Sequence, residues 1–305
     1  MIFNPRQVYN MYKGSGINVM EYLRNNFHDS VDESKCIEIS YDFQTGSYVD
    51  ALNNKNYFEQ KMSYVAKIVK TILELCMPSS ILEAGVGEAT TLAYVAKYLN
   101  RDSNYYGFDM SWSRAWYARK FLHKNGLGNA NICTGDLLNI PCRSNSIDVV
   151  YTSHSIEPNR GSEETILKEL YRVTKKFLIL LEPGYEFATK EGMKRMDRLG
   201  YCKNLKEISL SLGYSVIRHE LFASEMNPLN PTAIIVIEKN CGLEREPIEG
   251  EIWACPKFNC PLVEVDNFLF SREALVAYPI LKGIPCLKIE NGIFSSKIEE
   301  YIACS

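Results

Sequence analysis

The sequence predicts a doubly wound α/β fold, in which helices cover both faces of a largely parallel sheet. Between about residue 80 and residue 238, short apolar runs alternate with stretches that carry apolar residues at helical spacing. The runs are continuous, as residues 177–181 show, and strands buried on both faces have this pattern. The apolar share of 46% and the charged share of 23% are typical of a chain that folds around a core.

Composition narrows the class of protein. A length of 305 residues corresponds to about two domains. No run approaches the ~18 apolar residues of a membrane helix, and the first ten residues lack the apolar stretch of a secretory signal. The formal net charge of -3 disfavours a nucleic-acid acceptor, since such binding depends on clustered Lys and Arg. Most of the ten cysteines are scattered, which indicates reduced thiols and a cytoplasmic location.

The first 78 residues predict a helical extension that precedes the sheet. Residues 57–75 carry Val65, Ile68 and Ile72 at helical spacing, and Pro78 ends this helix. Upstream, residues 41–48 are rich in aromatic and polar groups around a central glycine. This segment is either a lid over a bound ligand or a plain surface loop.

The elements of the sheet follow one another along the chain, separated by glycine and polar residues. We expect strands at residues 81–84, 105–109, 131–133, 147–151, 177–181, 216–222 and 233–238. We expect helices between them at residues 88–99, 113–124, 163–173 and 203–212.

A change of composition marks a smaller C-terminal module. Residues 241–251 contain two Gly, one Pro and four Glu, which is typical of a linker. We therefore expect a helical N-terminal extension at residues 1–78, an α/β domain at residues 79–240, and a small β-rich module at residues 251–305.

A glycine loop follows the first expected strand. In doubly wound sheets, ligands bind beyond the carboxyl ends of the strands. Gly85 permits a tight turn there, and Gly87 lets the backbone approach a ligand without a Cβ in the way. The loop departs from the dinucleotide fingerprint, because Ala89 follows at a short spacing and no third glycine comes after two intervening residues. Glu83 at the strand end would also repel a pyrophosphate.

Chemistry-bearing residues follow the next three strands in turn. Asp109 ends the second strand, where a carboxylate can accept hydrogen bonds from ribose hydroxyls. Asp136 follows the third strand beside the apolar Leu137, a setting suited to an adenine amino group. His154 follows the fourth strand. The alternative for each aspartate is an ordinary turn or capping residue.

These residues and their order resemble class I S-adenosylmethionine-dependent methyltransferases over about residues 79–240. The resemblance implies a seven-stranded sheet with a reversed last strand, and S-adenosyl-L-methionine as the cofactor. By motif match, the loop at residues 83–87 would hold the methionine portion, Asp109 the ribose, and Asp136 with Leu137 the adenine. The cofactor-binding residues expected in full are Glu83, Ala84, Gly85, Gly87, Asp109, Met110, Asp136, Leu137 and Ser153. The family's last loop glycine is Ala89 here, which the start of the next helix should tolerate.

The expected chemistry needs few catalytic groups. Methyl transfer from a sulfonium is an in-line displacement, for which the enzyme aligns the nucleophile and excludes water. A hydroxyl acceptor also benefits from a base near neutral pKa, the natural range of histidine. His154 is the candidate base, because the end of the fourth strand faces the methyl group in this fold. The alternative is a histidine that only caps or hydrogen-bonds a loop.

Residues near the same edge could contact the acceptor. Glu157 follows His154, and Glu182 and Tyr185 follow the fifth strand. They either bind acceptor hydroxyls or an amine, or they are solvated strand ends. Trp112 and Trp116 lie one helical turn apart after Asp109, where they either line the adenine pocket or pack in the core.

The C-terminal module resembles the small zinc-ribbon-like family that activates tRNA and translation-factor methyltransferases, over about residues 251–290. The resemblance rests on the segments Tyr278-Pro279-Ile280 and Gly283-Ile284-Pro285 and on the pair Cys255 and Cys260. A structural zinc site needs four ligands, usually in two close pairs. The second pair's positions hold Ser271 and Ala274, and only Cys286 lies nearby, so we expect no bound metal.

The sequence leads to a principal hypothesis and two alternatives. The principal one is a cytoplasmic S-adenosylmethionine-dependent methyltransferase that acts on a small-molecule or glycan-type acceptor. The first alternative is a methyltransferase of tRNA or a translation protein, suggested by the C-terminal module. The second is a non-catalytic, cofactor-binding scaffold. The module would activate in cis, position the acceptor, or only stabilise the fold.

Overall fold

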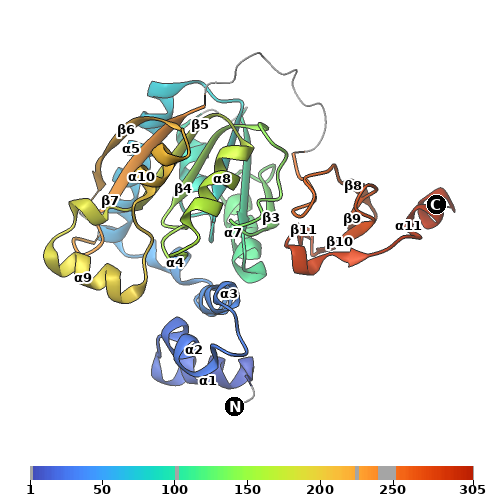
Figure 1. The fold of residues 1–305 in the computed structure, drawn as a ribbon, viewed down its shortest axis with the longest axis horizontal. Coiled ribbons are helices and arrows are strands. Elements are labelled where there is room, and N and C mark those ends of the chain that lie inside the picture. Colours follow the sequence, from blue (N-terminus) through green and yellow to red (C-terminus); the bar gives the residue numbers. More distant parts are fainter. Residues whose placement is uncertain (1–2, 100–102, 224–226, 240–251, 305) are drawn as a thin grey trace.

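A seven-stranded sheet forms the centre of the computed structural model, which describes residues 3–99, 103–223, 227–239 and 252–304 (Figure 1). Its strands are β1 (Ser80–Ala84), β2 (Asn104–Asp109), β3 (Asn131–Thr134), β4 (Ile147–Ser153), β5 (Thr174–Pro183), β6 (Ser215–Ala223) and β7 (Thr232–Glu238). The strand order is β3-β2-β1-β4-β5-β7-β6, and β7 runs antiparallel to both of its neighbours. The predicted doubly wound sheet with a reversed last strand is therefore confirmed.

The two faces of the sheet bury two separate apolar clusters. Successive side chains of a strand point to opposite faces, so Ile81 and Val149 belong to one cluster while Leu82 and Val150 belong to the other. The first face is covered by α5 (Lys55–Leu75), α6 (Leu92–Tyr98) and α7 (Trp112–Lys124), and the second by α8 (Glu163–Val173) and α10 (Leu205–Ser211). This double cover explains why the strands appear in the sequence as continuous apolar runs.

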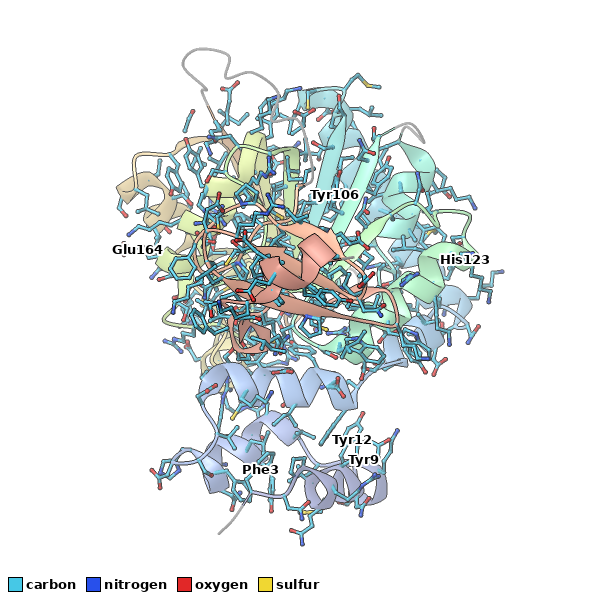
Figure 2. All side chains as sticks on the ribbon, turned by 90° about the vertical axis from the view of Figure 1, so that its right-hand side faces the viewer. Phe3, Tyr9, Tyr12, Tyr106, His123 and Glu164 are labelled. Carbon is cyan, nitrogen blue, oxygen red and sulfur yellow. The ribbon has the colours of Figure 1, made fainter. Side chains whose placement is uncertain are left out.

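The N-terminal helices form a group with its own small core. These are α1 (Pro5–Ser15), α2 (Val19–Phe27) and α3 (Glu33–Phe43), whereas Val49 of the short α4 (Ser47–Ala51) packs against the cluster of the first sheet face. The core includes Val8, Leu23 and Phe27, and the Phe3 ring packs edge-on against the Phe27 ring with centroids 5.4 Å apart. Figure 2 places Phe3 in this group below the sheet. Helix α3 separates the pair α1 and α2 from the rest of the molecule (Figure 1).

The C-terminal module is a small antiparallel sheet packed beside β3 (Figure 1). It contains β8 (Val263–Val265), β9 (Phe268–Ser271), β10 (Val276–Leu281), β11 (Ile284–Pro285), η2 (Ile289–Asn291), β12 (Ile293–Phe294) and α11 (Ile298–Cys304). A parallel bridge joins Cys286 to Thr134, and the Leu287 N–H donates to the Thr134 carbonyl at 3.1 Å. Trp253 and Leu287 are buried in the same apolar cluster as one face of the main sheet.

The predicted division of the chain into three parts stays a prediction, and two apolar clusters cross its boundaries. Val65 and Ile72 of α5 are buried with the first face of the sheet, and the C-terminal module shares the core of the second face. The linker predicted at residues 241–251 lies outside the described residues. Within the described ranges, no helix is both long and apolar enough to cross a membrane.

Two helical predictions need correction. The helix expected from residue 88 begins only at Leu92, because Gly87 and Ala89 both have positive φ values, of 55° and 58°, which a right-handed helix does not contain. Helix α9 (Lys190–Leu199) was not predicted. Its sequence is dominated by charged residues, and only Gly192 and Met196 are buried, so its apolar periodicity is weak.

The shared core predicts that the module and the main sheet unfold together. Trp253 is 6% exposed, and its ring lies edge-on to that of Tyr106 at 5.8 Å. We expect Trp253→Ala to lower the free energy of unfolding of the whole chain by about 3–5 kcal/mol, the usual cost of deleting a buried aromatic side chain. Denaturant unfolding followed by circular dichroism measures this. Phe294→Ala, at a residue 72% exposed, is the control. A separate early transition for the module, with the main transition unmoved, would contradict the shared core.

Candidate functional site

The carboxyl ends of the central strands open into a cavity of about 440 Å³. Parallel strands end at the same edge of a sheet, so the loops that follow β1, β2, β3 and β4 meet there. Among the residues predicted from the sequence, the cavity is lined by Glu83, Gly85, Gly87, Asp109, Met110, Asp136, Leu137, Ser153, His154 and Glu157. The sequence predictions thus converge on one cavity, while the role of each residue stays a prediction.

The glycine loop after β1 requires its glycines for both space and conformation. Gly85 has a φ of 75°, and a Cβ built on it would lie 2.3 Å from the Cβ of Ser155 in the loop after β4. The Ser155 hydroxyl donates to the Ala84 carbonyl at 2.7 Å. Ala84 is not among the residues that line the cavity, and its role in binding the cofactor stays a prediction. Ala89, in place of the family's last glycine, keeps a left-handed backbone.

Asp109 joins the glycine loop to the start of α7. Its carboxylate accepts the Gly87 N–H at 3.0 Å and the Ser111 N–H at 2.9 Å. Burial raises the pKa of Asp109, and the Arg114 guanidinium and the two backbone donors limit that rise. The buried carboxylate thus borders the cavity at the position predicted for a ribose.

Arg114 is a cavity residue that the sequence analysis did not identify. Its guanidinium lies 5.0 Å from the Tyr41 ring centroid and 4.9 Å from that of Tyr48. An arginine inside an amphipathic helix gives no signal in the sequence, because only the approach of the N-terminal segment places the two tyrosines against it.

The segment at residues 41–48 is attached to the glycine loop through Glu88. The buried Glu88 carboxylate accepts the Gly46 N–H at 2.9 Å and the Val49 N–H at 2.8 Å, at the beginning of α4. In addition, the Ser111 hydroxyl donates to Asp42 at 2.7 Å. The predicted lid segment therefore borders the site, and its movement as a lid stays a prediction.

Asp136 lies where the three parts of the chain meet. Its carboxylate accepts the Leu138 N–H at 2.9 Å and the hydroxyl of Ser34 on α3 at 3.2 Å. Burial raises the pKa of this carboxyl. Nearby, Lys288 of the C-terminal module forms a 2.8 Å ion pair with Glu38 of α3. The N-terminal helix α3 and the C-terminal module thus both form contacts at or near the loop predicted to hold the adenine.

A buried pair of opposite charges lines the cavity near the end of β1. Glu83 accepts the Tyr151 hydroxyl at 2.9 Å, and the Lys61 ammonium donates to the Thr91 hydroxyl at 2.6 Å. Burial raises the pKa of Glu83 to about 7 and lowers that of Lys61 to about 8, while the attraction between the two groups opposes both shifts. Lys61 was missed because it looks like a solvated residue on an amphipathic helix.

His154 and Glu157 form a hydrogen-bonded pair in the cavity wall. His154 Nδ1 lies 2.7 Å from Glu157 Oε2, and Nε2 lies 2.7 Å from the Thr232 hydroxyl. The backbone at His154 has a φ of 56°, in the left-handed region that non-glycine residues rarely adopt. Burial alone would lower the pKa of His154, but the hydrogen bond and charge of Glu157 outweigh burial and raise it.

Glu157 is held by three donors. Besides His154, the Asn230 amide donates to it at 3.1 Å, and the Tyr201 hydroxyl donates a further hydrogen bond. Burial would raise the pKa of Glu157, but these hydrogen bonds and the histidine charge keep it below its ordinary value. The pair is therefore an ionised carboxylate that orients an imidazole.

Glu182 and Tyr185, predicted to bind the acceptor, do not line the cavity. Glu182 is 2% exposed and accepts the backbone N–H groups of Ser155 and Glu157, each at 3.1 Å, so it supports the loop from beneath. Burial raises its pKa to about 7. Tyr185 belongs to η1 (Tyr185–Phe187), which turns its hydroxyl outward to the exposed Asp197 at 3.1 Å. Neither residue lines the cavity, and a role of either in binding the acceptor stays a prediction.

The two tryptophans of α7 pack against one another outside the cavity. The Trp112 and Trp116 rings stack with centroids 6.1 Å apart, and neither residue lines the cavity. Trp112 packs against the apolar cluster of the first sheet face. Of the two alternatives stated above, the structure favours the packing role.

The cysteines of the C-terminal module are hydrogen-bonded to neighbouring side chains. Cys255 lies 3.3 Å from the Tyr278 hydroxyl, and Cys260 lies 2.8 Å from the Ser271 hydroxyl. Ser271 also accepts the Ala274 N–H at 3.2 Å. Within the described part of the chain, no group of three or more His, Cys, Asp or Glu residues could hold a metal ion.

The cavity fits S-adenosylmethionine. Its volume lies within the range of about 300–1,000 Å³ that is usual for small-molecule sites. At Gly87, a Cβ would lie 3.0 Å from an Arg114 nitrogen, so the bare glycine keeps this wall open. Asp109 places a buried carboxylate at the end of β2, and Asp136 places a half-buried one after β3. These groups suit the hydroxyl and amino donors of an adenosyl moiety.

Comparison with known proteins agrees with this geometry. Residues 81–176 match a family model described as a methyltransferase domain. The chain also resembles the solved structure of magnesium protoporphyrin IX methyltransferase from Synechocystis with bound SAH, at 16% identity and a TM-score of 0.50, covering 66% of this chain and 99% of that chain. A SAM-dependent methyltransferase from Aquifex aeolicus is similar at 15% identity and a TM-score of 0.43, covering 78% and 99%.

A third similar structure is the Haloferax volcanii complex between the Trm112 methyltransferase activator and a methyltransferase. The identity is 13% and the TM-score 0.49, and the match covers 65% of this chain and 97% of that chain. The family match, with the strand order and the motif residues at the strand ends, confirms the predicted enzyme class. Residues 81–176 of the chain thus form a methyltransferase domain.

The contact between Gly85 and Ser155 predicts a matched pair of glycine variants. Gly85 and Gly126 have φ values of 75° and 77°, so alanine costs each about 1–2 kcal/mol of backbone strain. Nothing lies within 4 Å of a Cβ at Gly126, whereas at Gly85 it meets Ser155. We expect Gly85→Ala to weaken binding of S-adenosylhomocysteine, measured by calorimetry, by more than roughly tenfold, and Gly126→Ala to leave it unchanged. Equal losses in both variants would contradict the packing argument.

Proposed function

We propose that this methyltransferase acts on the hydroxyl group of a small-molecule or glycan-type acceptor. The observation that supports this most is the His154–Glu157 pair in the wall of the same cavity that the glycine loop lines. A sulfonium methyl donor needs no help to become electrophilic, but a hydroxyl acceptor must lose a proton. The near-neutral charge of the chain and the moderate size of the cavity also suit a small acceptor.

S-adenosylmethionine would supply the electrophilic methyl group, and residues of three loops would hold it. The turn at Gly85 and Gly87 would hold its methionine portion, and Asp109 would accept hydrogen bonds from its ribose hydroxyls. Asp136 would accept the adenine amino group beside Leu137. The Lys61 ammonium, which lines the cavity, is suited to bind a carboxylate of the cofactor.

His154 would act as the general base. Glu157 holds the proton of the imidazole on Nδ1, so that Nε2 carries the lone pair. Nε2 now meets the Thr232 hydroxyl at 2.7 Å. An acceptor hydroxyl that replaces Thr232 as the partner of Nε2 would pass its proton to the imidazole while its oxygen attacks the methyl group. Glu157 would stabilise the resulting imidazolium.

We also propose that the C-terminal module supports catalysis in cis. It contacts the strand that leads to Asp136, through the Leu287 N–H and the Thr134 carbonyl. Its Lys288 pairs with Glu38 on α3, the helix whose Ser34 donates to Asp136. The resemblance of the module to activators of tRNA and translation-factor methyltransferases is the reason to keep an RNA or protein acceptor as the second candidate.

The acceptor class is tested with cofactor that carries a radiolabelled methyl group, mixed with purified protein and a fractionated cell extract. Label in the small-molecule or glycan fraction supports the proposal, and label in RNA or protein supports the second candidate. Bound cofactor with no label in any fraction would support a non-catalytic scaffold. His154→Gln should lower the transfer rate by roughly 10²–10⁴-fold, the usual contribution of a general base, with cofactor binding retained.

The His154–Glu157 pair predicts a shift in titration that does not depend on knowing the acceptor. Because Glu157 raises the pKa of His154, Glu157→Gln should lower that pKa and move the acid limb of any rate profile to lower pH. The imidazole resonances followed by NMR against pH measure the shift. His219, which pairs with Glu186 elsewhere, is the internal control. An unmoved His154 resonance would show that Glu157 does not set its basicity.

The same pair predicts the sign of a stability change. A histidine whose pKa is raised by folding stabilises the fold fully below its ordinary pKa of about 6.5, and this contribution is lost as the pH rises through the folded value. Glu157→Gln should therefore destabilise the protein more at pH 6 than at pH 9, as measured by denaturant unfolding. An equal loss at both pH values would mean that the pair is not ionic.

A further inference from the structure

Arg195 on α9 places a positive charge in the wall of the cavity, where the Tyr201 side chain is a hydrogen-bond partner of its guanidinium. Its Nη1 atom is buried and has no hydrogen-bond partner among the described residues. The guanidinium lies 5.6 Å from the Tyr201 ring centroid. A buried donor without a partner destabilises the protein, and more so when it is charged, unless a bound group satisfies it.

The other two cationic side chains of the cavity, Lys61 and Arg114, already have partners near the loops predicted to hold the cofactor. Lys61 donates to Thr91 at 2.6 Å, and Arg114 lies against two tyrosine rings and is attracted by Asp109. Arg195 differs from both, because it comes from α9, which lies on the β7 side of the sheet, away from β3 and the C-terminal module (Figure 1). Its charge is therefore not needed to balance the groups predicted to hold the cofactor.

The carboxylates near Arg195 are occupied by other donors. Glu157 accepts from His154, Tyr201 and Asn230, and Asp197 accepts from Lys203 and Tyr185. Within the described ranges, neither these nor other carboxylates form an ion pair with Arg195. Arg195 thus lines the cavity and keeps one donor, Nη1, that has no partner among the described residues.

An unused acceptor lies at the same end of the cavity. The Asn230 amide nitrogen donates to Glu157, while its Oδ1 atom is buried without a partner among the described residues. Tyr201 lies between Glu157 and Arg195, since its hydroxyl donates to Glu157 and its ring centroid lies 5.6 Å from the Arg195 guanidinium. One unsatisfied donor and one unsatisfied acceptor therefore flank the His154–Glu157 pair.

We infer that the acceptor carries an oxyanion group, a carboxylate or a phosphate, which binds Arg195. Asn230 Oδ1 accepts a hydrogen bond from a hydroxyl or N–H of the same molecule. A charge-assisted hydrogen bond to a buried guanidinium orients an anionic acceptor and discriminates against its neutral analogue. This inference rests on the proposed function, and it narrows the acceptor to hydroxylated acids.

Binding of three small probes to protein saturated with S-adenosylhomocysteine tests this inference. Benzoate and phenyl phosphate carry the two kinds of oxyanion, and benzyl alcohol is the neutral analogue. We expect one or both anions to bind at least roughly tenfold more tightly than benzyl alcohol in an NMR titration. Arg195→Gln should remove this preference. Arg198→Gln, an exposed arginine of the same helix, should keep it and is the matched control.

The outcomes separate the inference from the function on which it rests. A preference for benzoate assigns a carboxylate, and one for phenyl phosphate assigns a phosphate. Anions that bind no better than benzyl alcohol, or equally well to Arg195→Gln, overturn the inference while bound S-adenosylhomocysteine leaves the proposed function standing. A folded protein that does not bind S-adenosylhomocysteine overturns both. With a labelled acceptor fraction in hand, Arg195→Gln should raise KM by roughly tenfold or more and leave kcat nearly unchanged.

Discussion

The contact between Gly85 and Ser155 is the constraint on which the geometry of the site depends. Strands β1 and β4 are neighbours in the sheet, so the loops that follow them must leave the same edge side by side. They fit only because Gly85 has no Cβ. The Ser155 hydroxyl also donates a hydrogen bond to the Ala84 carbonyl, which joins the two loops. Glu182, at the end of β5, holds the second loop from below. The cofactor loop and the His154 loop are thereby positioned as one unit.

The two appended parts of the chain are attached near loops at the same edge of the sheet. Glu88, after the glycine loop, binds the backbone of the N-terminal segment at Gly46 and Val49. The C-terminal module is attached at β3 and also pairs with α3 through Lys288 and Glu38. Each attachment lies within or next to a loop that lines the cavity. Disorder in either appended part would therefore be transmitted to the cofactor loops without any change in the central sheet.

The charged groups at the two ends of the cavity differ in how completely they are paired. Toward the cofactor loops, the charged groups of Asp109, Arg114, Glu83 and Lys61 compensate one another. Toward α9, the Glu157 carboxylate accepts hydrogen bonds from three donors. Arg195, in contrast, forms no ion pair with a carboxylate of the described residues. A buried charge with a partner of opposite sign destabilises the free protein less than an unpaired one does. The proposed anion at Arg195 would supply that missing partner, and α9 would then be the element that distinguishes one acceptor from another.

The sequence by itself determined the α/β fold and the residues that follow each strand. Continuous apolar runs specify buried strands, and Gly85, Asp109, Asp136 and His154 stand at their ends, where chain order alone brings them to one edge. The tertiary structure decided what these residues touch. Lys61, Arg114 and Arg195 look like solvated helix residues in the sequence and become cavity residues only through packing. Tyr185, one turn beyond its strand, faces outward instead. Periodicity encodes which face of an element is buried, but side-chain partners come from segments far apart in the chain.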